Sequence, residues 1–274
     1  MTRSTGRCWC IGLALAAVLA GPLRAAPRIV SLNPCSDAIL TEVADPAQIV
    51  ALSAYSHDPA TSSLPPAVAA RYATTRGTLE AVLMLHPDVV VDGAFVAPAT
   101  VRAYRALGLR LELFGTQRNL DDARRDIRRL AALAGHADRG EALIRRIDAA
   151  LIAAAPAHGT AQIDAVLWEW GGMVAGRDTL IGDLLTRTGF ANSPARQGYG
   201  QADIYPIERL LAAPPRVILT VGDDRMLHHP ALRALSNTAH VALPTGLISC
   251  GGPTIIPAVA QLARIRRALM GSKS

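Results

Sequence analysis

The stretch RIVSLNPCSDAILTEV, at residues 28–43, contains the first unit of the predicted fold. Its β-branched run at 28–32 predicts a short strand, because branched side chains pack well on a pleated sheet. Asn33-Pro34 then breaks the extended pattern, and residues 36–43 are predicted to form a helix. The folded part of the chain is therefore expected to start with a strand, a turn and a helix.

The same alternation continues to residue 114. The stretch TLEAVLMLHPDVVV, at residues 78–91, predicts a helix that Thr78 caps and His86-Pro87 ends, followed by a buried strand at 89–91. Further segments of these two kinds are predicted strands at 49–52 and 109–114 and a predicted helix at 98–107. Strands that alternate with helices indicate βαβ units, and hence a parallel sheet.

Between residues 120 and 155 the pattern changes to helix alone. Apolar residues recur at spacings of three, as at Ile127, Leu130 and Leu133, and of four, as at Ile147 and Leu151, while arginines occupy the opposite face. A second alternating region follows, with predicted strands at 163–168, 217–221 and 241–243 and predicted helices at 180–188, 206–211, 230–235 and about 254–270. Pro206 is predicted to be the first residue of its helix. The chain is thus predicted to contain two α/β lobes joined by a long helical connector.

The first 25 residues have the layout of a secretory signal peptide. Met1–Arg7 carries two arginines and no acid, residues 8–19 are almost entirely apolar, and Leu23-Arg24-Ala25 resembles a small-residue cleavage site. The apolar segment is shorter than the roughly 20 residues that span a bilayer. We therefore expect a soluble protein that is exported to the periplasm and begins near Ala26; an uncleaved anchor is the alternative.

Charge excludes one class of partner. The chain has a formal net charge of +6, but three arginines lie in the leader, which leaves 25 basic against 22 acidic residues. No basic stripe with interleaved aromatic residues is present, so no nucleic acid partner is expected. The predicted organisation is a signal peptide at 1–25, an N-terminal α/β lobe at 26–118, a helical connector at 119–157 and a C-terminal α/β lobe at 158–274.

Several stretches, taken in order, resemble one family. They are the two quoted above, IVALSAYS at 49–56, LGLRLELF at 107–114, MVAGRDTLIGDLLTRTGFAN at 173–192 and PIERLLAAPPRVILT at 206–220. They are similar to the periplasmic solute-binding proteins of the cobalamin and iron-siderophore class, the helical-backbone (class III) family that serves ABC importers. The resemblance spans essentially the whole mature chain.

The resemblance implies both a fold and a function. The fold has two Rossmann-like lobes, each with a central, mostly parallel sheet, bridged by a long α-helix. The function is to capture a metal chelate in the cleft between the lobes and to deliver it to an ABC permease in the inner membrane. The chelate expected from the family is cobalamin or another corrinoid, an iron-siderophore, or haem. We expect a monomer without a cofactor of its own, in which metal enters only as part of the cargo.

Two glutamates are candidates for contact with the permease. In the family, one glutamate near the start of a helix on each lobe docks onto permease arginines, and Glu80 and Glu208 occupy the matching phrases TLEAV and PIERL. Acids are also common in first helical turns because the helix dipole stabilises them, so simple capping is the alternative. The presence of one such acid in each lobe favours docking.

Cys35 and Cys250 remain after the leader is removed. By resemblance, Cys35 lies at the floor of the cleft, after the first strand, and Cys250 faces it from the loop before the last helix. Three possibilities stay open: a disulfide, which is common in oxidising compartments; soft ligands to a metal-bearing solute; or two unrelated buried thiols. A disulfide requires Cα atoms within about 7 Å.

Further cleft contacts are expected from the resemblance and from side-chain chemistry. Gly251 follows Cys250 and lets a ligand approach the backbone closely. An aromatic face suits a flat macrocycle, and an arginine suits a carboxylate or phosphate. The remaining candidates are Tyr55, Arg76, Trp170, Met173 and Tyr199. The alternative for each is an ordinary surface or core residue.

The sequence offers little support for other functions. Its histidines have no spacing that indicates a metal site, and it contains no G-x-S-x-G, H-E-x-x-H or P-loop signature. We therefore predict a binding protein with no catalytic residues. The alternatives are an exported enzyme that uses a cleft cysteine as nucleophile, and a ligand-sensing domain that passes its signal to a receptor.

Overall fold

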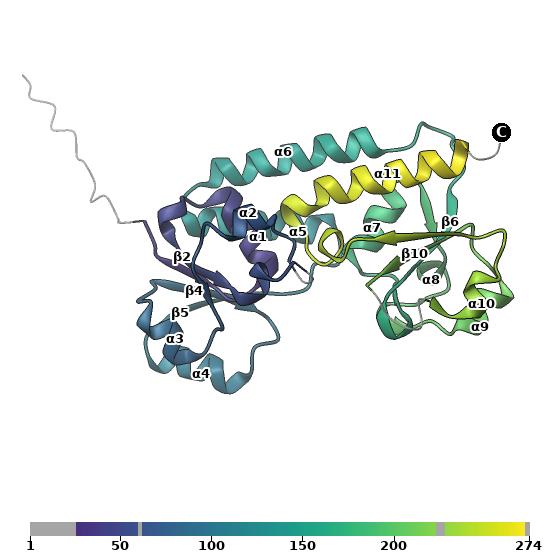
Figure 1. Ribbon diagram of the computed structural model, residues 1–274. Coiled ribbons are helices and arrows are strands. Elements are labelled where there is room, and N and C mark those ends of the chain that lie inside the picture. The colour runs from purple at the N-terminus through teal and green to yellow at the C-terminus, as the bar shows by residue number, and fades with distance from the viewer. Residues whose placement is uncertain (1–25, 60–61, 223–227, 272–274) are drawn as a thin grey trace, which may run out of the picture.

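The computed structural model of this 274-residue chain describes residues 26–59, 62–222 and 228–271. Figure 1 shows two lobes below two long helices, α6 (Ala137–Ala154) and α11 (Ile255–Gly271). The predicted signal peptide lies outside the described residues. In these ranges, no helix combines the length and the apolar character needed to cross a membrane.

A five-stranded parallel sheet forms the core of the N-terminal lobe. In the order β3-β2-β1-β4-β5, its members are β1 (Ile29–Ser31), β2 (Ile49–Ser53), β3 (Thr74–Thr75), β4 (Val89–Gly93) and β5 (Arg110–Phe114). Val89–Val91 is almost fully buried, as expected for a parallel strand that is covered on both faces. The order of the strands reverses between β1 and β4, and such a point leaves a crevice at the carboxyl ends of the two strands.

Helices cover both faces of this sheet, because alternate residues of a strand point to opposite sides. The helices of the lobe are α1 (Pro34–Val43), α2 (Pro66–Ala69), α3 (Leu79–Met84) and α4 (Pro98–Ala106). Val30 and Val90 pack in one cluster with Tyr104 of α4 and with α3. Ile29 and Val89 belong to a second cluster that includes α1.

The connector consists of two helices. The first, α5 (Leu120–Ala134), begins at Asn119, whose side chain accepts a hydrogen bond from the backbone N–H of Asp122. It ends at Gly135, which adopts a left-handed conformation with φ 81°. The second helix, α6, crosses from one lobe to the other, and α11 lies alongside it (Figure 1). The 3-10 turn at Gly252–Thr254, just before α11, contacts α1 of the N-terminal lobe.

A mixed sheet forms the core of the C-terminal lobe. In the order β11-β10-β6-β7-β9, its members are β6 (Ile163–Trp168), β7 (Met173–Ala175), β9 (Gln201–Ile204), β10 (Val217–Val221) and β11 (Ala239–Leu243), and β8 (Phe190–Asn192) pairs with β6. Its helices are α7 (Leu180–Arg187), α8 (Ser193–Arg196), α9 (Ile207–Ala212) and α10 (Pro230–Arg233). The pairs of β6 with β8, β6 with β10, and β10 with β11 are parallel, whereas β7 is antiparallel to both of its neighbours.

One hydrophobic cluster extends through both lobes. It runs from Ile29 in β1 through Ile147 in α6 to Val217 in β10 and Leu262 in α11. The two lobes therefore share one hydrophobic core along α6 and α11. A flexible linker would not join them in this way.

The structure confirms the α/β fold with two lobes and a crossing helix. It also corrects some boundaries. The first helix begins at Pro34, because the Asn33 side chain accepts hydrogen bonds from the N–H groups of Cys35 and Ser36 and so acts as its N-cap. Pro206 is the N-cap of α9 and not its first residue. Strands β3, β7, β8 and β9 were not predicted, since each has only two to four residues and shows no period.

Candidate ligand-binding cleft

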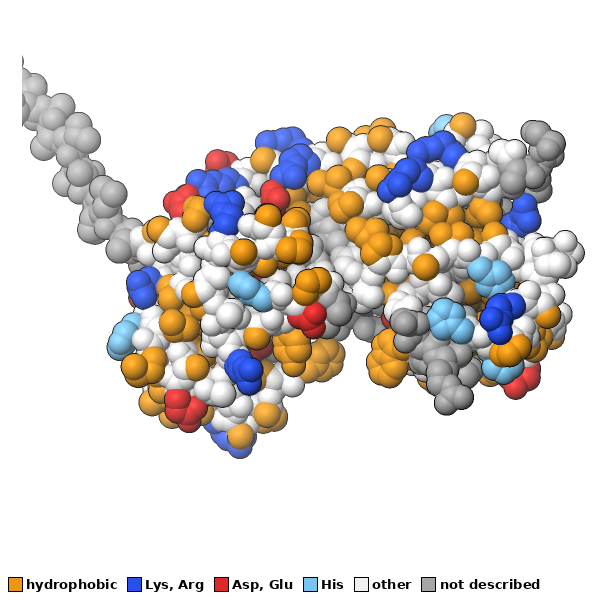
Figure 2. Space-filling view, viewed as in Figure 1, with side chains coloured by type: hydrophobic (Ala, Val, Ile, Leu, Met, Phe, Trp, Pro, Cys, Tyr) orange, Lys and Arg blue, Asp and Glu red, His pale blue; other side chains and the backbone are white. Residues whose placement is uncertain are grey.

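A cavity of about 380 Å³ lies between the two lobes. Figure 2 shows the hollow from outside, with hydrophobic side chains on both of its edges. Its volume falls in the range of roughly 300–1,000 Å³ that is typical of small-molecule sites. Both lobes contribute to the lining, so a solute held here contacts both at once.

The N-terminal lobe lines the cavity with residues at the carboxyl ends of its central strands. Cys35 follows β1, Phe95 follows β4, and the segment 114–117 ends and follows β5. Ligands of open α/β sheets bind at this edge, where the strand order reverses. The Phe95 side chain is 89% exposed and presents an aromatic ring to the cavity.

The C-terminal lobe supplies the opposite wall. Glu169 directly follows β6, the residues of β7 lie next along the wall, and Thr179–Ile181 begins α7. The Thr179 hydroxyl accepts a hydrogen bond from the Gly182 N–H at 3.2 Å, which fixes the start of that helix. The side chain of Met173 in β7 adds a polarisable thioether to the lining.

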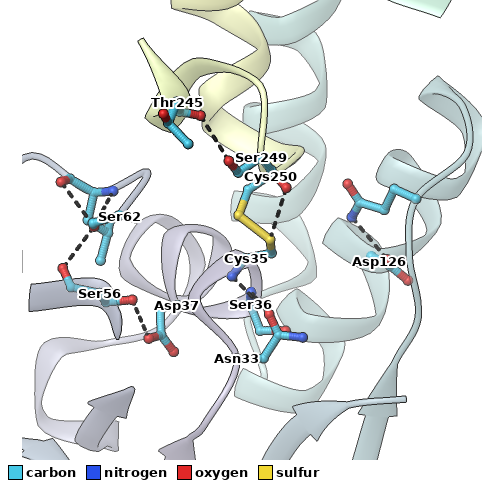
Figure 3. Close-up of a disulfide and its surroundings, with 12 residues drawn as sticks. Asn33, Cys35, Ser36, Asp37, Ser56, Ser62, Asp126, Thr245, Ser249 and Cys250 are labelled. Carbon is cyan, nitrogen blue, oxygen red and sulfur yellow. Dashed lines mark hydrogen bonds between the residues drawn. A yellow bond between two sulfur atoms is a disulfide. The ribbon is translucent and has the colours of Figure 1, made fainter. Parts of the chain in front are cut away.

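Cys35 and Cys250 form a disulfide, with their Cα atoms 5.0 Å apart. The bond joins the first turn of α1 to the segment before α11, and both cysteines line the cavity (Figure 3). Sγ of Cys35 also lies 3.5 Å from the carbonyl oxygen of Ser249. Of the three possibilities for this pair, the structure therefore shows the disulfide. A disulfide sulfur is neither a thiol nucleophile nor a thiolate ligand.

Gln117 and Asp126 form a polar pair in the cavity wall. Nε2 of Gln117 donates to Oδ2 of Asp126 at 2.9 Å, and burial raises the pKa of this aspartate. A Cβ atom on Gly251 would overlap the Gln117 side chain. The absence of a side chain at position 251 therefore lets Gln117 pack against the backbone there.

Glu169 is the second carboxylate of the lining. Its backbone N–H donates to the carbonyl of Met173 at 2.8 Å, which holds the turn between β6 and β7. Its side chain is half-buried, and burial raises the pKa of the carboxyl group. Within 26–59, 62–222 and 228–271, the carboxylate makes neither a hydrogen bond nor an ion pair.

A third carboxyl group, that of Asp37, lies buried in the first turn of α1, below the disulfide and next to Ser56 in the view of Figure 3. Oδ2 accepts hydrogen bonds from the Ser53 N–H at 2.9 Å and from the Ser56 hydroxyl at 2.6 Å, while Oδ1 has no partner in the described residues. Burial raises the pKa of Asp37 from 3.8 to about 7. The carboxyl group therefore connects the first turn of α1 to the end of β2 and to the turn that follows it.

The structure separates the predicted ligand contacts into two groups. Those that line the cavity are Cys35, Met173, Cys250 and Gly251; those that do not are Tyr55, Arg76, Trp170 and Tyr199. The Tyr199 ring packs edge-on against that of Tyr205, with centroids 5.0 Å apart. Strand β6 ends at the buried Trp168, so Trp170 falls in the following turn and is 63% exposed.

Sequence reasoning did not identify several lining residues, among them Phe95, Phe114, Gln117 and Glu169. All of them end or closely follow a strand that the sequence does predict. Their position at the carboxyl edge of a sheet is the signal that would have identified them.

Glu80 and Glu208 lie as the sequence predicts, in the first turns of α3 and α9. Both are exposed. Helices α3 and α9 lie on the side of the lobes that faces away from α6 and α11 (Figure 1). In the part of the chain that the structure describes, no group of three or more His, Cys, Asp or Glu side chains could hold a metal ion.

The fold agrees with solved structures of binding proteins. A periplasmic heme-binding protein, RhuT from Roseiflexus sp. RS-1, is 22% identical with a TM-score of 0.73, covering 89% of this chain and 99% of its own. The periplasmic vitamin B12 binding protein BtuF of Vibrio cholerae is 19% identical with a TM-score of 0.68, covering 89% and 98%. A possible iron-binding (periplasmic solute-binding) protein from Staphylococcus epidermidis is 16% identical with a TM-score of 0.71, covering 88% and 98%.

A comparison with curated proteins finds no match. The family description "Periplasmic binding protein" matches residues 29–240, which include the N-terminal sheet, the crossing helix α6 and the C-terminal sheet except for the end of β11. This chain belongs to the periplasmic binding protein family.

Proposed function

We propose that this protein is the solute-binding component of an ABC importer, exported to the periplasm, and that its cargo is a metal chelate. The observation that carries the proposal is the cavity of about 380 Å³ between the lobes, at the carboxyl ends of the strands, in a member of this family. The similar structures are named for heme, vitamin B12 and iron, so a corrinoid, haem or an iron-siderophore is the proposed class of cargo.

The lining supports a large and flat cargo. Phe95 exposes 89% of its surface although it is apolar, and Phe114 lies in the same wall. Covering the exposed Phe95 ring on ligand binding removes apolar area from water, which stabilises the complex by about 25 cal/mol per Å². Phe95 thus takes the stacking role that the sequence suggested for tyrosines.

Closure of the lobes is proposed to be small. Helices α6 and α11 both pass from the region of one lobe to the other, and the Cys35–Cys250 disulfide links the lobes at the cavity floor. A rotation of one lobe against the other would bend these helices and would also shift the hydrophobic core that the lobes share. Specificity then depends on the preformed walls more than on a large conformational change.

Docking to the permease is proposed to use Glu80 and Glu208. Both carboxylates are exposed, and their helices lie on the face opposite to α6 and α11, so a flat partner can contact one on each lobe. An exposed acid in a first helical turn is a suitable partner for an arginine.

The proposal is tested by titrating the mature chain, from Ala26, with cyanocobalamin, haem and a ferric siderophore. Tryptophan fluorescence is the readout, with free tryptophan as the control for inner-filter absorption. Saturable one-to-one quenching by one chelate is expected, and Phe95→Ala should weaken it. Ile152→Ala is the matched control, because Ile152 is 78% exposed and lies on α6. Failure of every chelate to bind would contradict the proposed function.

A further inference from the structure

The lining of the cleft is unbalanced in charge. It contains the carboxylates of Asp126 and Glu169, and none of its described residues is a lysine, an arginine or a histidine. A carboxylate or phosphate on a ligand would therefore lose its hydration in this cavity without gaining a cationic partner, which costs several kcal/mol.

Two arginines that flank lining segments in the sequence, Arg118 and Arg177, are engaged elsewhere. Arg118 binds Asp122 with Nε to Oδ2 at 2.9 Å, and Nη2 of Arg177 donates to the carbonyl of Gly198 at 3.1 Å. Neither residue belongs to the lining.

The two carboxylates of the lining differ in the number of hydrogen-bond and ion-pair partners that the protein gives them. Asp126 accepts the hydrogen bond from Gln117 and has Arg129 at 3.8 Å, so its charge is shared within the protein. Glu169 has no such partner among the described residues, although it is half-buried at the end of β6. Partial burial without a partner raises the free energy of the charged Glu169 carboxylate, and a cationic ligand would recover part of that cost.

We propose that this cleft selects its chelate by charge, taking a cationic or neutral chelate and rejecting an anionic one, and that Glu169 is the residue that determines the preference. The proposal rests on the function proposed above and narrows its cargo. Haem, whose propionates are anionic, and anionic ferric siderophores are then poor ligands. Amide-rich corrinoids and cationic hydroxamate chelates fit the lining.

The test uses pairs of chelates that share a scaffold and differ by one positive charge. Aquocobalamin and cyanocobalamin form one pair; ferrioxamine B and its N-acetyl derivative form the other. Haem and ferric enterobactin are the anionic probes. Dissociation constants are measured by titration calorimetry for the mature protein, for Glu169→Gln, and for Glu42→Gln, a matched control on the outer face of α1, where Glu42 is exposed and pairs with Arg146.

In the scaffold that binds, the cationic member should bind roughly tenfold to a hundredfold more tightly than the neutral one, as a charge–charge interaction over roughly 6–12 Å at an effective dielectric constant of about 20 predicts. Glu169→Gln should bring this ratio close to one while the neutral member still binds. Glu42→Gln should leave it unchanged. A change in the ratio, and not in overall affinity, is a result that a purely structural role of Glu169 would not produce.

Two results would overturn the inference while leaving the proposed function intact. One is binding of haem or ferric enterobactin as tight as that of the cationic chelates. The other is a cation preference that Glu169→Gln does not alter. If none of the six chelates binds, the proposed function itself fails, and the inference fails with it.

Discussion

Removal of the interlobe disulfide should cost the protein much of its stability. The Cys35–Cys250 bond connects residues 215 apart in the sequence, so it closes nearly the whole folded chain into one loop. In the chain-entropy model a loop of this length stabilises the folded state by about 5 kcal/mol, and measured values are typically 2–4 kcal/mol. We therefore expect Cys35→Ala/Cys250→Ala to lower the free energy of unfolding by about 2–5 kcal/mol.

The assay is urea unfolding of the mature chain, followed by circular dichroism and by tryptophan fluorescence. The midpoint should shift to lower urea in the double variant, and the slope should stay the same or rise because the uncrosslinked unfolded chain is less compact. Wild-type protein with a thiol reductant should unfold like the double variant. The double variant itself should not respond to reductant, which makes it the control.

An equal midpoint for the oxidised wild type and the double variant would refute this reasoning. That result would mean that the core shared along α6 and α11 already restricts the lobes so strongly that the bond adds nothing. A lower midpoint on reduction of both proteins would instead show an effect of the reductant that is unrelated to the bond.

Three further predictions concern Asp37, Gly251 and the pair Glu80 and Glu208. Because the pKa of Asp37 is raised to about 7, the folded state favours the protonated carboxyl group. The contribution of this group to the free energy of unfolding is therefore complete below pH 4 and is lost as the pH rises through 7. Relative to Asp37→Asn, the wild type should lose roughly 3–5 kcal/mol of stability over that range, measured by urea unfolding at each pH. Gly251→Ala should displace Gln117 and weaken chelate binding at least tenfold in a titration, whereas a distant Gly→Ala change on α11 should not. Glu80→Arg/Glu208→Arg should abolish uptake by whole cells and leave chelate affinity unchanged.

Each of these has a result that would count against it. Parallel pH profiles for wild type and Asp37→Asn would remove Asp37 as the source of the pH dependence. If Gly251→Ala binds the chelate as tightly as the control Gly271→Ala, the Gln117 side chain can move aside without any loss of affinity, and the prediction is wrong. Normal uptake with both glutamates reversed would exclude them from docking; Asp138→Arg, an exposed acid in the first turn of α6 on the opposite side, is the matched control.

The pattern of apolar residues was sufficient to predict most of the fold. The run at 89–91 is buried on both faces, and the three-residue spacing at 127, 130 and 133 marks the helical connector. The ends of individual helices depend on single residues, which the pattern of apolar residues does not reveal. The division of the connector at Gly135 depends on a left-handed residue, and the start of α1 depends on the Asn33 cap.

The candidate site was predicted only in part. Cys35 and Cys250 meet because residues 215 apart are brought together by the crossing helices, a relation that the resemblance suggested and that spacing alone does not show. Glu169 and Phe95 gave no motif, because an isolated acid or aromatic ring after a strand has many structural uses. Their role depends on a cavity that exists only when both lobes are assembled.

If the cleft binds a metal chelate, the metal must lie inside the cavity between the lobes. The most direct measurement is an anomalous difference map, recorded at the metal's absorption edge, of crystals of the mature protein grown with the chelate that binds. We expect one dominant peak inside the cavity, between Phe95 of the N-terminal lobe and Glu169 and Met173 of the C-terminal lobe. A dominant peak on the outer surface, with the cavity free of metal, would contradict it.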